Sequence, residues 1–66
     1  MRIICTASVE DDDSLKFLTE KVKALNGTIK ATGHSVYAEY EGDDRNAEQL
    51  ADLFSKYHFY GISFLP

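Results

Sequence analysis

The spacing of the apolar residues changes repeatedly along the chain, and the order of these changes limits the fold more than any other sequence feature. Arg2 to Val9 alternates imperfectly and contains the Ile, Cys, Thr and Val residues that suit a β-strand. After the acidic run Glu10–Asp13 the apolar residues recur every three or four positions, which predicts an amphipathic helix that stops at Asn26 and Gly27. The apolar stripe of this helix is Leu15, Leu18, Val22 and Leu25.

The second half of the chain shows the same changes of spacing. Two β-prone segments, Thr28 to Thr32 and Ser35 to Glu41, flank Gly33 and His34 and predict a hairpin. A second helix is predicted to open at Gly42-Asp43-Asp44, with Asp43 or Asp44 as its N-cap. Its apolar stripe is Ala47, Leu50, Phe54 and Tyr57, with Ala51 and Leu53 alongside. Phe59 to Leu65 predicts the last strand, which Pro66 closes.

This element order, β-α-β-β-α-β, predicts one α+β domain over residues 1–66 with the ferredoxin-like, or split βαβ, arrangement. Right-handed crossovers give a four-stranded antiparallel sheet in the order 4-1-3-2, with both helices on one face. Alternation predicts that the following side chains face the helices: Ile3, Cys5, Ala7, Val9, Val36, Ala38, Tyr40, Tyr60, Ile62 and Phe64. The open face is predicted to carry Ile4, Tyr37 and Phe59 among polar residues.

The composition disfavours several classes of function. A chain of 66 residues buries only about 60% of the surface that its unfolded form exposes, so an elaborate active site is not expected. The formal charge of -4 disfavours direct binding of nucleic acid or of an anionic membrane. The lone Cys5 makes no internal disulfide, and no Cys/His spacing supplies a zinc site, so neither metal nor cofactor is expected. No signal peptide or spanning helix is recognisable, which predicts a cytoplasmic protein.

Enzymatic chemistry has little support in the sequence. Glu39 and Glu41 share one strand face, but no apolar pocket or neighbouring base sets them apart as an acid and a base. Cys5 on a strand is typical of a small buried hydrophobic residue. His34 and His58 fall near one end of the sheet, where a transition-metal site is conceivable, although turn and surface histidines are far commoner. We therefore expect a protein that is not an enzyme.

Charge is distributed unevenly along the chain. The net charge is -3 over residues 1–13, +3 over residues 14–38 and -5 over residues 39–52. Because strands 1 and 3 are antiparallel, the two acidic blocks are predicted at opposite ends of the sheet, about 25 Å apart. Each block adjoins a helix N-terminus, so helix capping and solubility are one explanation of the acids.

Capping does not explain every acid in the second block. Glu39 and Glu41 lie on a strand, and Glu48 and Asp52 are one helical turn apart, where like charges repel. These positions favour an acidic surface that binds a basic partner. The predicted partner-binding residues are Glu10, Asp11, Asp12, Asp13, Tyr37, Glu39, Glu41, Asp43, Asp44, Glu48 and Asp52.

In size, acidity and element order, the chain resembles the small inhibitors encoded by phages, including anti-CRISPR proteins. That resemblance implies a DNA mimic, which presents carboxylates where nucleic-acid phosphates would bind and competes for a basic groove. The alternative is a self-associating or regulatory module that buries its open sheet face through Ile4, Tyr37 and Phe59. A monomer or a weak homodimer is expected.

Overall fold

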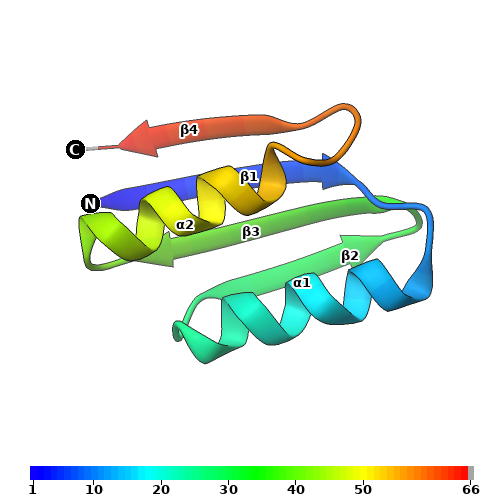
Figure 1. The fold of residues 1–66 in the computed structure, drawn as a ribbon, viewed down its shortest axis with the longest axis horizontal. Coiled ribbons are helices and arrows are strands. Elements are labelled where there is room, and N and C mark those ends of the chain that lie inside the picture. Colours follow the sequence, from blue (N-terminus) through cyan, green and yellow to red (C-terminus); the bar gives the residue numbers. More distant parts are fainter. Residues whose placement is uncertain (66) are drawn as a thin grey trace.

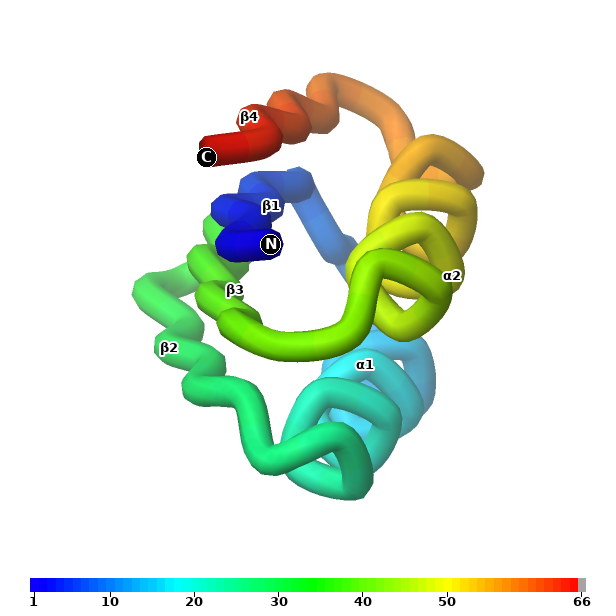
Figure 2. Tube along the Cα trace, turned by 90° about the vertical axis from the view of Figure 1, so that its left-hand side faces the viewer, coloured from blue at the N-terminus to red at the C-terminus, as the bar shows by residue number. Residues whose placement is uncertain are grey.

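The computed structural model describes residues 1–65, which form one open sheet with two helices on the same side (Figures 1 and 2). The elements are β1 (Arg2–Ser8), α1 (Asp12–Ala24), β2 (Thr28–Thr32), β3 (Ser35–Glu41), α2 (Asp44–Phe54) and β4 (Gly61–Leu65). The strand order is β2-β3-β1-β4, with every neighbouring pair antiparallel. Counted from β4, this is the predicted order 4-1-3-2. The molecule is therefore an α+β protein with a four-stranded antiparallel sheet.

Helix α1 and the hairpin that follows it lie where the sequence predicts them. The Asp11 side chain accepts a hydrogen bond from the backbone N–H of Ser14 at 2.9 Å, which starts the helix. Asn26 adopts a left-handed conformation, with φ of 64°, and ends it. Gly27 then passes so close to β3 that a Cβ atom there would lie 2.7 Å from the Glu39 carbonyl oxygen. Only glycine fits this approach.

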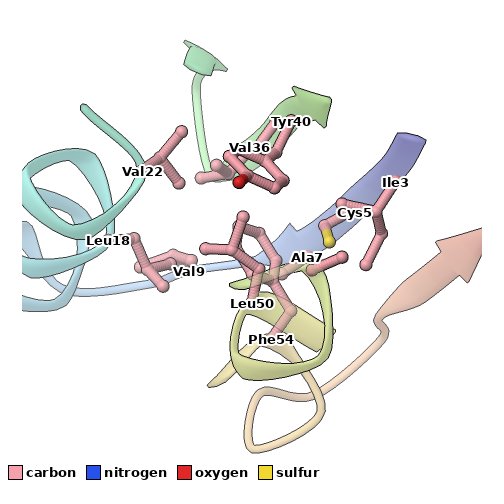
Figure 3. Close-up of a cluster of buried hydrophobic side chains, with 12 residues drawn as sticks. Ile3, Cys5, Ala7, Val9, Leu18, Val22, Val36, Tyr40, Leu50 and Phe54 are labelled. Atoms are coloured by element: carbon pink, nitrogen blue, oxygen red, sulfur yellow. The ribbon is translucent and has the colours of Figure 1, made fainter. Parts of the chain in front are cut away.

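The core fills the space between the helices and the inner face of the sheet (Figure 3). On β1 the alternation is confirmed, because Ile3, Cys5 and Ala7 are buried, as is Val9 just beyond the strand. The remaining core residues are Leu18, Val22, Val36, Ala38, Tyr40, Ala47, Leu50 and Phe54. Helix α2 packs chiefly on β1, whereas α1 packs on β2 and β3.

The last strand differs from the prediction in its start and in its burial. β4 begins at Gly61 and not at Phe59, because Phe59 has a φ of 53°, which is outside the extended region. Tyr60 and Phe64, predicted to be core, are 52% and 49% exposed, and Ile62 is half-buried. Phe64 pairs with Ile3 and so faces the helix side, but α2 lies over β1 and leaves β4 uncovered (Figure 2).

No helix within residues 1–65 is long and apolar enough to cross a membrane. The longest dimension of the described chain is 30 Å, and the strands run along it (Figure 1). The acidic runs Glu10–Asp13 and Glu41–Asp44 lie near opposite ends of this axis.

Candidate protein-binding surface

The predicted binding residues form two acidic groups at opposite ends of the sheet. The α1 acidic group consists of Glu10, Asp11, Asp12 and Asp13 and follows β1. The α2 acidic group consists of Glu41, Asp43, Asp44, Glu48 and Asp52 and begins at the end of β3. Because β1 and β3 are antiparallel, α1 and α2 start at opposite ends of the molecule (Figure 1). The structure therefore does not bring all the predicted residues together.

Helix capping accounts for part of the α1 acidic group. The Asp11 carboxylate accepts the hydrogen bond from the N–H of Ser14, and this bond holds the pKa of Asp11 below that of an ordinary aspartate. Asp12 and Asp13 occupy the first turn, where the positive end of the helix dipole stabilises negative charge. Local helix stability is thus sufficient to explain the aspartates at this end.

Capping does not account for the α2 acidic group. Asp43 occupies the N-cap position, as predicted, but its side chain accepts no capping hydrogen bond. The hydroxyl of Tyr40 accepts hydrogen bonds from the backbone N–H of Asp43 at 3.1 Å and from the Asn46 side chain at 3.2 Å. The expectation that the side chain of Asp43 caps this helix is wrong. Tyr40, on β3, binds the backbone N–H of Asp43 itself, which is not the N–H that an N-cap side chain accepts from. The carboxylate of Asp43 is exposed.

Glu39 and Tyr37, both predicted to bind a partner, are instead engaged with each other on the open face of the sheet. Tyr37 donates its hydroxyl hydrogen to Glu39 at 2.5 Å, and Arg2 from β1 contacts the other carboxylate oxygen at 3.4 Å. The bond from Tyr37, followed by Arg2, lowers the pKa of Glu39, and the same bond raises the pKa of Tyr37. Glu39 is therefore a partly neutralised carboxylate, half-exposed within a local network.

Few of the other acids have a cation nearby. Asp44 lies 3.6 Å from the N-terminal ammonium group of Met1. Within residues 1–65 no ion pair involves Glu41, Asp43, Glu48 or Asp52, and all four are exposed. These four carboxylates therefore have no ion-pair partner in the described part of the chain.

The acids Asp44, Glu48 and Asp52 form one stripe along α2, about 80° wide, and of the three only Asp52 borders the hollow between the helices. Gln49 and Leu53 line a hollow of about 400 Å³ between the two helices, together with Asp52 and Lys56. At about 100° per residue, Asp44 and Glu48 lie about 140° around the helix axis from Gln49 and Leu53. Because α1 lies over β2 and β3, the flank that carries Asp44 and Glu48 faces the β4 side (Figure 2).

The open sheet face contains a second hollow, of about 880 Å³. Phe59 lines it and is 90% exposed, while Tyr37 is 41% exposed and Ile4 is half-buried. The other lining residues are Thr6, Ala7, Ser8, Thr28, Lys30, Thr32, Ser35, Val36 and Glu39. This face is a shallow surface of hydroxyl groups with two aromatic rings.

The cysteine and the two histidines, which are the residue types most often used in catalysis or metal binding, make structural contacts in this fold. Cys5 is buried in the core, and burial raises the pKa of its thiol to about 11, which disfavours the nucleophilic thiolate. His34 and His58 flank the end of β1: His34 Nδ1 lies 3.3 Å from the Val9 carbonyl oxygen, and the His58 carbonyl accepts from the Ser8 N–H. In the described part of the chain, no group of three or more His, Cys, Asp and Glu residues could hold a metal ion.

The residues that the sequence does not reveal are Tyr40, whose hydroxyl accepts from the backbone N–H of Asp43, and the half-exposed pair Tyr60 and Phe64. Tyr40 precedes Asp43 by three residues, which is a spacing that could have suggested the contact. The exposure of Phe64 depends on where α2 lies on the sheet and has no signal in the alternation.

No known protein settles the function by similarity. No protein-family model, curated protein or solved structure matches this chain. Function is therefore inferred from the residues and their geometry.

Proposed function

We propose that this protein is a cytoplasmic, non-enzymatic inhibitor whose acidic surface occupies a basic, nucleic-acid-binding surface of a partner protein. The observation that supports this most directly is the state of Asp43: it stands at a helix N-cap, yet within residues 1–65 its carboxylate neither caps the helix nor pairs with a cation. Glu41, Glu48 and Asp52 are similarly exposed and without counterions among residues 1–65. Glu48 and Asp52 lie one turn apart beyond the first turn of α2, where like charges repel, so these two acids do not stabilise the helix by their charge.

The proposed mechanism is competition by charge mimicry. The α2 acidic group presents carboxylates to Lys and Arg side chains that otherwise bind phosphates, as in the DNA-mimicking anti-CRISPR proteins that the chain resembles. Complementary charge increases the rate at which the two proteins associate, and the affinity of the complex should fall as the salt concentration rises. Glu39 and Tyr37 contribute less than the sequence suggested, since they are bound to each other and to Arg2.

The fold is suited to this use. We assign it to the ferredoxin-like arrangement, on the basis of the element order, the antiparallel strand order and the two helices on one side of the sheet. This arrangement places the start of α2 and the end of β3 at one end of the molecule, where a partner can reach them without entering a cleft.

The test is competition with DNA for candidate nucleic-acid-binding effector proteins, followed by the anisotropy of a labelled duplex. The concentration needed to displace the duplex should be at least about tenfold higher for the variant Glu41→Gln/Asp43→Asn/Glu48→Gln than for the wild type. A tenfold change corresponds to about 1.4 kcal/mol of binding free energy. The matched control is Glu10→Gln/Asp12→Asn/Asp13→Asn, which removes the same charge from the other end and keeps the Asp11 cap. Equal loss in both variants would show that only net charge matters and would refute a localised acidic surface.

A second candidate function is self-association or regulation through the open sheet face. The observation that favours it is Phe59, a bulky residue with a φ of 53° whose side chain is 90% exposed beside the hollow. Such a backbone conformation costs about 1 to 3 kcal/mol for a non-glycine residue and is often associated with function. Sedimentation of the wild type and of Phe59→Asn, a residue that tolerates this φ, tests the idea. A wild type that stays monomeric at high concentration excludes it.

A further inference from the structure

β4 forms one edge of the sheet, and its outer side is open. The bonds from Val9 N to His34 O at 2.7 Å and from Gly42 N to Met1 O at 2.9 Å show that odd-numbered residues along β1 bond toward β3. Since bonding alternates in antiparallel pairs, the even-numbered residues bond toward β4, where they pair with Gly61, Ser63 and Leu65. The backbone groups of Ile62 and Phe64 therefore point away from the sheet. Within residues 1–65 no strand pairs with them.

The side chains along this edge do nothing to block another strand. β4 contains no charged residue, and Phe64 is 49% exposed beside half-buried Ile62. The opposite edge differs, because β2 carries Lys30 and is packed against α1. Charged residues and covering helices are the usual means of protecting a sheet edge, and β4 has neither.

The negative charge beside β4 distinguishes between two possible binding partners of this edge, a second copy of the chain and a basic segment of another protein. The flank of α2 that faces the β4 side carries Asp44 and Glu48. A second copy paired through β4 around a two-fold axis would bring these two flanks toward each other and oppose like charges. A basic segment would instead meet opposite charge there.

We propose that β4 binds an extended basic segment of the partner as an additional antiparallel strand, with Lys or Arg alternating with small apolar residues. The inference rests on the proposed function and specifies how the basic partner is held. Residues of the added strand that bond to Ile62 and Phe64 share their face, which is the helix side. A Lys there covers the Phe64 ring with its aliphatic stem and extends its ammonium group toward Glu48.

The experiment uses a fluorescein-labelled peptide of four Lys-Val repeats, titrated with the intact chain at low salt and followed by anisotropy. Two N-methylated versions distinguish strand addition from general charge attraction, because N-methylation removes backbone donors and keeps the charge. Methylation of the Lys amides, which face β4 in this register, should weaken binding about tenfold or more. Methylation of the Val amides, which point to solvent, should change it by less than about twofold.

The protein variants complete the test. Glu48→Gln should weaken binding of the Lys-Val peptide, and a Glu-Val peptide of the same length should not bind. Equal binding of the two methylated peptides, with the effect of Glu48→Gln retained, overturns strand addition and leaves the acidic-surface proposal standing. If the peptide shows the expected methylation pattern but the DNA competition fails, the proposed function is wrong. Sedimentation showing a wild-type dimer that Phe64→Lys abolishes would identify a second copy as the occupant and overturn the inference.

Discussion

Truncation of Leu18 tests the packing of α1 on the sheet. Leu18 is fully buried on α1, in the same core cluster as Val9 and Val22. Buried Leu→Ala changes cost about 2.7 to 5.0 kcal/mol, the lost transfer free energy plus a cavity. A chain of 66 residues has a total stability of about 3 to 10 kcal/mol. We expect Leu18→Ala to remove about 3 kcal/mol, which is a large share of the total.

The assay is urea unfolding followed by far-ultraviolet circular dichroism, with a thermal melt beside it. For an m-value of about 1 kcal/mol/M, the urea midpoint should fall by about 3 M, and Tm by more than about 10 °C. The matched control is Phe17→Ala at the preceding residue, whose side chain is 44% exposed and has Lys21 Nζ 5.5 Å from its ring centroid. Phe17→Ala should cost much less. Equal costs at the two positions would show that the assigned buried face of α1 is wrong.

Three further predictions concern the cap, the thiol and a close backbone approach. Asp11→Ala should lower Tm more than Asp13→Ala, because only Asp11 accepts from Ser14 N–H and alanine has no acceptor. Since that bond lowers the pKa of Asp11, its stabilisation is present near neutral pH and is lost as pH falls below about 4; melts over this pH range check it. The Cys5 thiol, with its pKa raised to about 11, should resist iodoacetamide in the folded protein and react once urea unfolds it; rapid native-state reaction would contradict its burial. Gly27→Ala should destabilise by about 1 to 3 kcal/mol in urea unfolding, because its Cβ would lie 2.7 Å from the Glu39 carbonyl oxygen, and an unchanged midpoint would contradict that contact.

Most of the fold was predictable because its signals are local. The alternation on β1 and β3 identifies their buried faces, since a one-residue shift would move every apolar side chain to solvent. The helix positions follow from the apolar spacing and from Asn26 and Gly27 after α1. The failure at Phe59 is also local in origin: its β propensity is high, but the backbone turns there, which propensity does not reveal.

The candidate site was less predictable because charge pairing depends on register. Glu39 is an exposed acid in the sequence pattern, yet the pairing of β1 with β3 places Arg2 within 3.4 Å of it. Asp43 stands at the N-cap position, where local rules assign its carboxylate to capping, yet that carboxylate makes no capping bond. The contact between Arg2 and Glu39 joins residues on two strands, and spacing along one strand does not show it.

The exposure of β4 follows from how few residues there are to cover the sheet. With α1 over β2 and β3 and α2 over β1, the helices of residues 1–65 leave the inner face of β4 open. Phe64 then remains half-exposed beside backbone groups with which no strand of residues 1–65 pairs, and such an edge promotes unwanted association. In the proposed complex, Asp44 and Glu48 on the adjoining flank of α2 would oppose pairing between two copies and favour a basic strand. The charge that looks surplus for folding would then have two effects at the same edge: it would discourage self-association, and it would select the partner.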